Sequence, residues 1–407
     1  MNTRVFSSWL ARSLLIAAFI SWVGTCPAAE PTKATERLER AWPGHPEWAA
    51  MLADILDGSQ LGPEDGWFKK ATAQARFTWE ATRAKLDADG DGRVGRAEFP
   101  GLDADFARLD RDRDGSIGAA DFDFTAHALM PSPGSFFFNA ADRDGNGKVS
   151  PEEFNAVFKA LDADKQGFLA LADLQRAFAM PARRPAPSAG SAPAPAPASS
   201  GPSKWTLIKG LFRQEIGSLQ AGPALGELAP DFTLKTVDGR DEVTLSKLVG
   251  PKPVVLVFGN FSCGPFRSRA GDVEKLSARM GDRANFAMVY VREAHPTDGW
   301  QMESNDRVGV SFRQPTSFQE RTDIAQTCAR TLGLGMPTLV DAMDDRVGAA
   351  YSGMPSRLYL IDRDGKVAYK SGRGPFGFKP AELEHQLLLL LAEGSGGTQA
   401  QAARPSP

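Results

Sequence analysis

Short apolar runs alternate with helical repeats along the C-terminal half of the chain. Residues 254–259 are apolar up to a final glycine, a pattern typical of a strand buried on both faces, and residues 285–291 carry a similar run. A hairpin is expected at 357–362 and 367–370, around Asp364-Gly365, and a helix from Pro380 to Glu393. These patterns predict an α/β domain over 204–395.

The N-terminal half follows a different pattern, which occurs four times between residues 81 and 180. Each repeat has oxygen-bearing side chains at positions 1, 3 and 5, glycine at 6, an apolar residue at 8 and an acid at 12. An EF-hand calcium loop needs these oxygens, a sharp turn at the glycine and a backbone carbonyl at position 7. The repeats therefore predict an all-α EF-hand domain that binds Ca²⁺, placed ahead of the α/β domain.

The four loops share this layout but differ in the acid that closes them. Loops one and three end in glutamate, which can offer both oxygens to the ion, so we expect them to bind calcium best. Loops two and four end in the shorter aspartate, and loop four has a neutral residue at position 5 and should bind least well. The expected ligand positions are Asp87, Asp89, Asp91, Arg93 and Glu98 in loop one; Asp110, Asp112, Asp114, Ser116 and Asp121 in loop two; Asp142, Asp144, Asn146, Lys148 and Glu153 in loop three; and Asp162, Asp164, Gln166, Phe168 and Asp173 in loop four.

The spacing of the loops also predicts how they pack. Loops starting at 87 and 110, and at 142 and 162, leave room only for a shared or shortened helix between neighbours. The apolar residues at position 8 should join neighbouring loops through a short β-bridge.

Composition marks the segments outside these two domains. Arg4 and Arg12, an apolar run and small residues up to Ala29 have the layout of a secretory signal over 1–29, so we expect export to the periplasm or beyond rather than an uncleaved membrane anchor. A helical segment is expected over 30–80 and a disordered tail over 396–407. Proline, alanine and serine dominate 181–203, which predicts an extended linker and little coupling between the calcium loops and the C-terminal domain.

Charge and cysteine counts narrow the classes of function. With 47 basic and 50 acidic residues the formal net charge is −3, which argues against a basic nucleic-acid binder. Three cysteines exclude a disulfide scaffold and a cysteine-rich zinc site. The oligomeric state is left open by the sequence.

Cys263 stands where the buried strand at 254–259 is expected to turn into a helix. Free N–H groups and the helix dipole stabilise a thiolate there, so we expect a pKa below the value of a free cysteine. Phe266 occupies the position of a Cys-x-x-Cys partner, which argues against a dithiol exchange catalyst. A cysteine at such a turn, more strands and a closing helix indicate a thioredoxin-like plan, in which Pro355 would be a cis-proline facing the cysteine.

These residues resemble the iodothyronine deiodinases, a family with a thioredoxin fold, over most of 226–392. Residues 257–266 are similar to its strand and active-site turn, with Cys263 where selenocysteine normally stands, and residues 293–300 are close to the family's Glu-Ala-His-Pro-Ser-Asp-Gly-Trp motif. Residues 357–361 and 372–375 match two further signatures. The resemblance implies that His295 and Arg373 clamp a substrate phenol or assist proton transfer, and that Glu293 helps to position it. Cys328 is then the remaining thiol that could resolve an oxidised Cys263.

Two functions from different classes follow. The first is an exported, cysteine-dependent thiol oxidoreductase that acts on a halogenated phenol or a peroxide-like small molecule with a thiol reductant, His295 being the expected proton source. The second is a calcium-binding structural or interaction protein with an inactive thioredoxin-like domain. The presence of Cys263, His295 and Arg373 together favours the enzyme.

Overall fold

The computed structural model describes residues 36–59 (except 39 and 45), 71–124, 141, 149–162, 165–170, 173, 203–306 (except 219) and 308–402. The expected signal at 1–29, nearly all of the expected linker and the first seven residues of loop three lie outside these ranges. Within them, no helix combines the length and the apolar character needed to cross a membrane.

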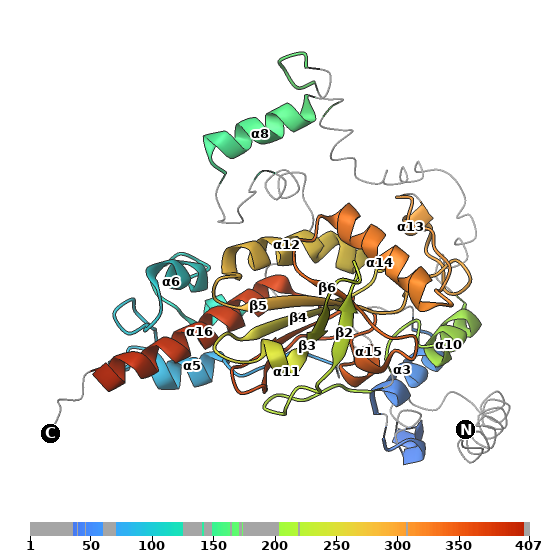
Figure 1. The fold of residues 1–407 in the computed structure, drawn as a ribbon. Coiled ribbons are helices and arrows are strands. Elements are labelled where there is room, and N and C mark those ends of the chain that lie inside the picture. Colours follow the sequence, from blue (N-terminus) through green and yellow to red (C-terminus); the bar gives the residue numbers. More distant parts are fainter. Residues whose placement is uncertain are drawn as a thin grey trace, which may run out of the picture.

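An eight-stranded mixed sheet forms the centre of the molecule, in the order β1-β8-β7-β4-β5-β6-β2-β3 (Figure 1). Strands β4, β5 and β6 run parallel to one another, whereas β7 is antiparallel to β4 and β8 is antiparallel to β7. Every residue of β4 is buried, as its continuous apolar run predicts. The strands are β1 (Gln74–Ala75), β2 (Thr233–Thr236), β3 (Glu242–Thr244), β4 (Val254–Gly259), β5 (Asn285–Tyr290), β6 (Thr338–Val340), β7 (Arg357–Ile361) and β8 (Val367–Lys370).

Helices cover both faces of the sheet. Figure 1 shows α12 (Gly264–Met280) and α14 (Phe318–Leu332) on one side and α11 (Leu245–Leu248) and α15 (Arg346–Ala350) on the other. Helix α16 (Pro380–Ala402) packs on β7, β8 and α12 and runs further than the sequence pattern suggests, into the expected tail. The β4–α12–β5 unit, the β7–β8 hairpin and α16 together form the thioredoxin-like arrangement that the sequence predicts.

The first two calcium loops form a compact pair. Helix α5 (Trp79–Leu86) leads into loop one, and α6 (Asp103–Leu109) is the shortened helix between the loops, followed by the 3₁₀ turn η1 (Ala119–Phe122). Val94 and Ile117 form the expected antiparallel bridge, with N–O distances of 2.9 and 3.0 Å. Between loops three and four the chain forms one helix, α8 (Pro151–Leu161), which starts with a capping box from Ser150 and Glu153.

Two expectations about the N-terminal half are corrected. Residues 71–78 are not helical but include β1, which pairs with β8 at the edge of the C-terminal sheet. The pair of loops is not separate from the α/β domain either, because Phe99, Phe106 and Leu109 belong to the same hydrophobic core as the sheet. The long linker follows the calcium loops in sequence but does not keep loops one and two away from the C-terminal domain.

Charged contacts reinforce this interface. Both carboxylate oxygens of Asp105 on α6 accept hydrogen bonds from Arg283, at 2.7 and 2.6 Å. Glu384 on α16 pairs with Arg108 of α6 and with Arg279 of α12. Loops one and two are therefore fixed to the α/β domain by apolar packing and by ion pairs.

A second hydrophobic cluster lies outside the main core. It joins α3 (Pro46–Asp57) to α10 (Lys204–Phe212) through side chains that include Trp48, Ile55 and Leu211.

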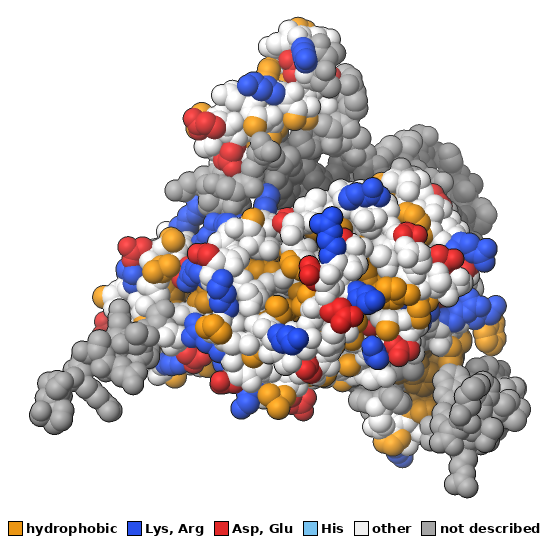
Figure 2. Space-filling model, in the orientation of Figure 1, with side chains coloured by type: hydrophobic (Ala, Val, Ile, Leu, Met, Phe, Trp, Pro, Cys, Tyr) orange, Lys and Arg blue, Asp and Glu red, His pale blue; other side chains and the backbone are white. Residues whose placement is uncertain are grey.

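On the surface, basic and acidic side chains are interspersed over the face drawn in Figure 2, in keeping with the near-neutral net charge.

Candidate active site and calcium loops

Cys263 is the N-cap residue of α12 and directly follows the turn that leaves β4. The side chain of Asn260 organises this turn, because its Oδ1 accepts hydrogen bonds from the N–H of Cys263 (3.0 Å), the hydroxyl of Ser262 (3.1 Å) and the N–H of Ala294 (3.2 Å). Its Nδ2 donates to the carbonyl of Pro355 (3.0 Å), and the Met354–Pro355 bond is cis, as predicted. Asn260 thus ties the cysteine turn to both the Pro355 loop and the 293–300 segment.

Glu293 is fully buried beneath the same turn. Its carboxylate accepts hydrogen bonds from the N–H of Ser262 (2.8 Å) and from the hydroxyl of Tyr290, which in turn accepts one from the N–H of Phe261 (3.1 Å). Burial raises the pKa of Glu293, although the hydrogen bonds from Ser262 and Tyr290 oppose the shift. Glu293 holds the backbone before Cys263, so in this structure it is a positioning residue.

The expectation of a low pKa for Cys263 is wrong, because the thiol is buried. The residue is 1% exposed, and loss of solvation raises the thiol pKa to about 11. The N–H of Phe266, the nearby Ser356 hydroxyl and Arg267 favour the thiolate but do not outweigh that loss. A helix start therefore does not by itself activate a sulfur that water cannot reach.

His295 is half-buried, and its ring packs edge-on against Trp300 with 4.4 Å between ring centroids. Burial lowers its pKa to about 4, so the ring is neutral near pH 7 and does not supply the expected proton as an imidazolium. Nδ1 lies 3.1 Å from the carbonyl oxygen of Trp300. Because a carbonyl only accepts, Nδ1 carries the proton and Nε2 keeps a lone pair able to accept a hydrogen bond.

Arg373 is buried and ion-paired with Glu47 of α3. Its guanidinium also makes long contacts to the carbonyls of Ser218 (3.5 Å), Met354 (3.4 Å) and Gln220 (3.5 Å). Burial lowers its pKa to about 10. The carbonyl of Met354 thus contacts Arg373, and the carbonyl of the next residue, Pro355, contacts Asn260 of the cysteine turn.

Cys328 is also buried, on α14, and burial raises its pKa further than that of Cys263. Both thiols are close enough to Arg267 to favour its charged form, although burial lowers its pKa overall. Arg267 donates to the carbonyl of Phe261 and to Asn305 Oδ1 (2.7 Å). Both cysteines are free thiols in this structure.

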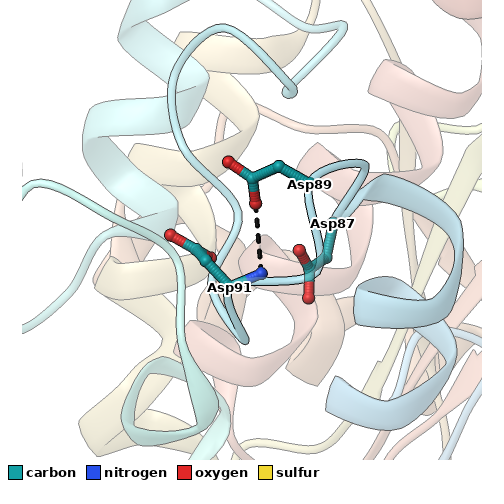
Figure 3. Close-up of side chains that lie close together, drawn as sticks. All are labelled: Asp87, Asp89 and Asp91. Atoms are coloured by element: carbon teal, nitrogen blue, oxygen red, sulfur yellow. Dashed lines mark hydrogen bonds between the residues drawn. The ribbon is translucent and has the colours of Figure 1, made fainter.

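Loop one brings the carboxylates of Asp87, Asp89 and Asp91 together, with one oxygen of each within 4.8 Å of the others. Figure 3 shows them around a single turn of backbone, with the N–H of Asp91 donating to Asp89 Oδ1 (3.1 Å). Gly92, at position 6, has a φ of 85°, which suits glycine. Three converging carboxylates and this turn fit a calcium ion.

Loop two gathers a different set, Asp110, Asp112 and Asp121, within the same 4.8 Å limit. Asp121 is buried, and burial raises its pKa even though three backbone N–H groups donate to it. Asp114 at position 5 instead pairs with Arg93 of loop one (2.8 Å). A cation here would be held by positions 1, 3 and 12, which is a smaller set than the sequence pattern implies.

Loops three and four are described only in part. Asp142, Asp144, Asn146, Lys148 and Asp164 lie outside the described residues, whereas Glu153 is engaged in the cap of α8. Asp162 accepts hydrogen bonds from the N–H groups of Gln166 (2.7 Å) and Gly167 (2.8 Å), as the first residue of an EF-hand loop does.

The sequence analysis assigned no role to several residues of the site. Asn260, Ser262 and Tyr290 form the network around Cys263, and they lie within three residues of motif positions 263 and 293. Proximity to these motifs was the available signal. Glu47 is different, because it reaches Arg373 from a segment with no recognised motif.

Comparisons with known proteins agree with this geometry. Residues 205–389 match a family model for iodothyronine deiodinase, and residues 137–158 match one for an EF hand. A thyroxine 5-deiodinase of Sparus aurata is 35% identical over 164 residues, which is 40% of this chain and 60% of that protein. A type I iodothyronine deiodinase of Xenopus laevis is 31% identical over 39% of this chain and 61% of its own length.

The chain therefore spans about 60% of the length of these curated relatives. Among solved structures, a thiol:disulfide interchange protein from Bacteroides sp. aligns with 42% of this chain and 91% of its own, at 15% identity and a TM-score of 0.30. The match to the family model identifies residues 205–389 as an iodothyronine deiodinase-like domain, in a chain that also matches an EF hand.

Proposed function

We propose that this chain is an exported calcium-binding protein whose C-terminal domain is a cysteine-dependent, deiodinase-like thiol oxidoreductase that removes a halogen from an aromatic ring. The observation that carries the proposal is that Cys263 begins α12 at a turn whose Asn260 is hydrogen-bonded both to cis-Pro355 and to Ala294 of the 293–300 segment. The match of residues 205–389 to the deiodinase family supports the same reaction class.

The chemistry needs one nucleophile and a second thiol. The Cys263 thiolate attacks the iodine of an iodophenol, which forms an S–I bond and transfers the carbon–iodine electron pair to the ring carbon, where a proton is taken up. A second thiol then attacks the Cys263 sulfur, forms a disulfide and releases iodide. The net change is Ar–I + 2 RSH → Ar–H + RSSR + I⁻ + H⁺, so the thiol reductant is oxidised and the ring carbon is reduced.

His295 has a defined part in this reaction. With Nδ1–H bonded to the Trp300 carbonyl, Nε2 keeps a lone pair that would accept the phenolic proton, and the ring would then be more electron-rich at the carbon that gains hydrogen. Glu293 acts through the backbone of Ser262 and keeps the cysteine turn in place. Neither role needs His295 to be charged at neutral pH.

Calcium belongs to the N-terminal loops rather than to the reaction. Asp87, Asp89 and Asp91 would hold an ion in loop one, and Asp110, Asp112 and Asp121 in loop two. Extracellular modules of this kind bind calcium with dissociation constants of roughly 10⁻⁴–10⁻³ M. Because loops one and two share a core with the sheet, bound calcium would stabilise both halves.

The test is turnover by the full-length protein with a thiol reductant, using an iodophenol and, separately, hydrogen peroxide. Iodide release that is lost in Cys263→Ser supports the proposal, and peroxide consumption alone would point to a peroxidase. The raised pKa of Cys263 favours one alternative, a calcium-binding interaction protein with an inactive domain. Absence of Cys263-dependent turnover with both substrates would select that alternative.

A further inference from the structure

Glu215 is a buried acid that the proposed reaction does not use. It follows α10 and is 5% exposed. The backbone fixes its place, because the N–H of Glu215 donates to the carbonyl of Gly210 (2.8 Å) and Gln214 turns the chain sharply with a φ of 58°. The next residue, Ile216, belongs to the hydrophobic cluster that joins α3 to α10. A carboxyl group held out of water in this way is unfavourable unless a hydrogen bond compensates it.

The carboxyl group of Glu215 lies against the backbone of the 293–300 segment. A Cβ atom at Gly299 would lie 2.7 Å from each of its two oxygens, which is closer than real Cβ atoms approach. The φ of Gly299 is outside the left-handed region, so the close approach, and not the backbone conformation, requires glycine here. The N–H of the next residue, Trp300, donates to Oε2 of Glu215 (3.3 Å). The contact with Glu215 therefore explains why this segment has glycine at position 299.

Trp300 connects Glu215 to His295. The N–H of Trp300 faces Glu215, whereas its carbonyl oxygen lies 3.1 Å from Nδ1 of His295. The indole ring packs edge-on against the imidazole and also against the cluster that joins α3 to α10. Which nitrogen of a histidine carries the proton is decided by the hydrogen bond that the ring makes. The orientation of the Trp300 backbone therefore determines that Nε2 of His295 is the free nitrogen.

The charges around Glu215 do not provide a second firm contact. Arg213 lies 3.9 Å from Oε1, but its side chain is 58% exposed, so this ion pair contributes little. Burial raises the pKa of Glu215, and nearby Asp298 adds to the rise. The N–H of Trp300, Arg213 and Arg292 act in the opposite direction. Within the described part of the chain, the N–H of Trp300 is the hydrogen-bond donor to this carboxyl group.

We propose that Glu215 is a positioning residue for His295: it holds the backbone N–H of Trp300, so that the Trp300 carbonyl keeps the proton of His295 on Nδ1 and leaves Nε2 free to accept one. Glu215 acts through Gly299 and Trp300 and takes no part in the bonds that form or break. The proposal rests on the proposed function only in giving Nε2 a phenolic proton to accept.

The experiment reads the proton on His295 directly, without turnover. The full-length protein is labelled with ¹⁵N-histidine, and ring resonances are recorded by NMR at pH 7, where burial keeps His295 neutral. The protein has four histidines, so the signal that is missing in His295→Gln identifies the residue. We expect the ratio of the Nδ1–H to the Nε2–H form to fall about fivefold in Glu215→Ala, the effect of losing one modest hydrogen bond. Glu215→Gln should restore most of the ratio, because its amide oxygen can accept from the same N–H.

A double-mutant cycle with Gly299→Ala tests the route through the backbone. The added methyl group meets the Glu215 oxygens, so Gly299→Ala alone should lower the same ratio, whereas in Glu215→Ala it should change the ratio little. The matched control is Glu227→Ala, which also removes a carboxylate that accepts one backbone N–H, that of Ala224 (2.8 Å), but from an exposed loop residue. This control should match the parent.

Three results would overturn the proposal: an unchanged His295 ring in Glu215→Ala, effects of Glu215→Ala and Gly299→Ala that simply add, or an equal change in Glu227→Ala. If Glu215→Ala does not fold, an unchanged ring in Gly299→Ala overturns the proposal on its own. Iodophenol turnover by the unmodified protein tests the proposed function separately. A changed His295 ring without turnover would retire the reaction and keep the role of Glu215, whereas turnover with an unchanged ring would do the reverse.

Discussion

Replacing Asp105 with asparagine tests whether the calcium loops and the deiodinase-like domain are one cooperative unit. Asp105 lies on α6 and receives two hydrogen bonds from Arg283, which stands just beyond α12. The two residues are 178 positions apart in sequence, so the pair connects the two halves of the chain. Asp105→Asn keeps the side-chain shape but removes the charge that Arg283 faces.

The expected loss follows from the exposure of the two partners. Breaking a fully buried ion pair on one side costs about 3–5 kcal/mol. The Asp105 carboxylate is 4% exposed, but Arg283 is 25% exposed and keeps part of its hydration, so we expect about 2 kcal/mol. For a domain of this size that corresponds to a fall in Tm of about 4–8 °C.

The assay is thermal unfolding of the full chain, followed by circular dichroism, with Asp103→Asn as the matched control. Asp103 is on the same helix and pairs with Arg96, but its side chain is 90% exposed, so its loss should change stability by about 0.5 kcal/mol or less. Equal Tm values for the two variants would refute the reasoning. A separate early transition in Asp105→Asn, with the main one unmoved, would show that the loops unfold independently.

Four further outcomes are expected. Calcium at about a hundred times its dissociation constant should stabilise the full chain by about 2.7 kcal/mol in a single transition, and Asp87→Asn should reduce that gain; a calorimetric scan that calcium leaves unchanged would contradict this. Because burial raises the pKa of Cys263 to about 11, the rate of its alkylation, followed by mass spectrometry, should increase with pH up to that region, and Cys263 should still react before Cys328. An alkylation rate that stops increasing near pH 8 would be inconsistent with the buried thiol. Glu293→Ala should lower kcat of any Cys263-dependent turnover by about tenfold and cost about 1–3 kcal/mol of stability, because the N–H of Ser262 and the hydroxyl of Tyr290 lose their acceptor. Unaltered kinetics would remove the positioning role of Glu293. Burial lowers the pKa of His295 to about 4, whereas an unfolded histidine titrates near 6.5, so the unfolded state binds more protons than the folded state between these pH values. Stability should therefore fall as the pH drops from about 6.5 towards 4, and urea unfolding across this range should show a shallower fall in His295→Gln.

Local patterns explain which parts of the fold the sequence could predict. β4 and the β7–β8 hairpin depend on runs of neighbouring apolar residues, and the Val94–Ile117 bridge depends on a fixed position within each loop. Cys263 at a helix start follows from a strand, a turn and a proline that are adjacent in sequence. Each of these features follows from a pattern within one short stretch or from a repeated motif, so periodicity and spacing were sufficient.

The features that were not predicted depend on distant partners. The pKa of Cys263 depends on its burial as well as on the helix start, and the sequence indicates the helix start alone. Arg373 was assigned to substrate by resemblance, but its partner Glu47 is 326 positions away. Asp103 and Asp105 look alike in sequence, and only the position of Arg283 makes one of them part of an interface.

The same distant contacts explain why the calcium loops and the candidate active site are not independent. Glu47 of α3 pairs with the side chain of Arg373. Further along the chain, the carbonyl of Ala71 accepts a hydrogen bond from the backbone N–H of the same arginine (3.0 Å). β1 then pairs Gln74 with Lys370, and four residues after β1 the chain enters α5, which leads directly to Asp87 of loop one. One stretch of the N-terminal half thus contacts the side chain of Arg373, then its backbone, then the end of β8, and finally forms the first calcium loop. A linker later in the sequence cannot uncouple segments that are already hydrogen-bonded to the same edge of the sheet.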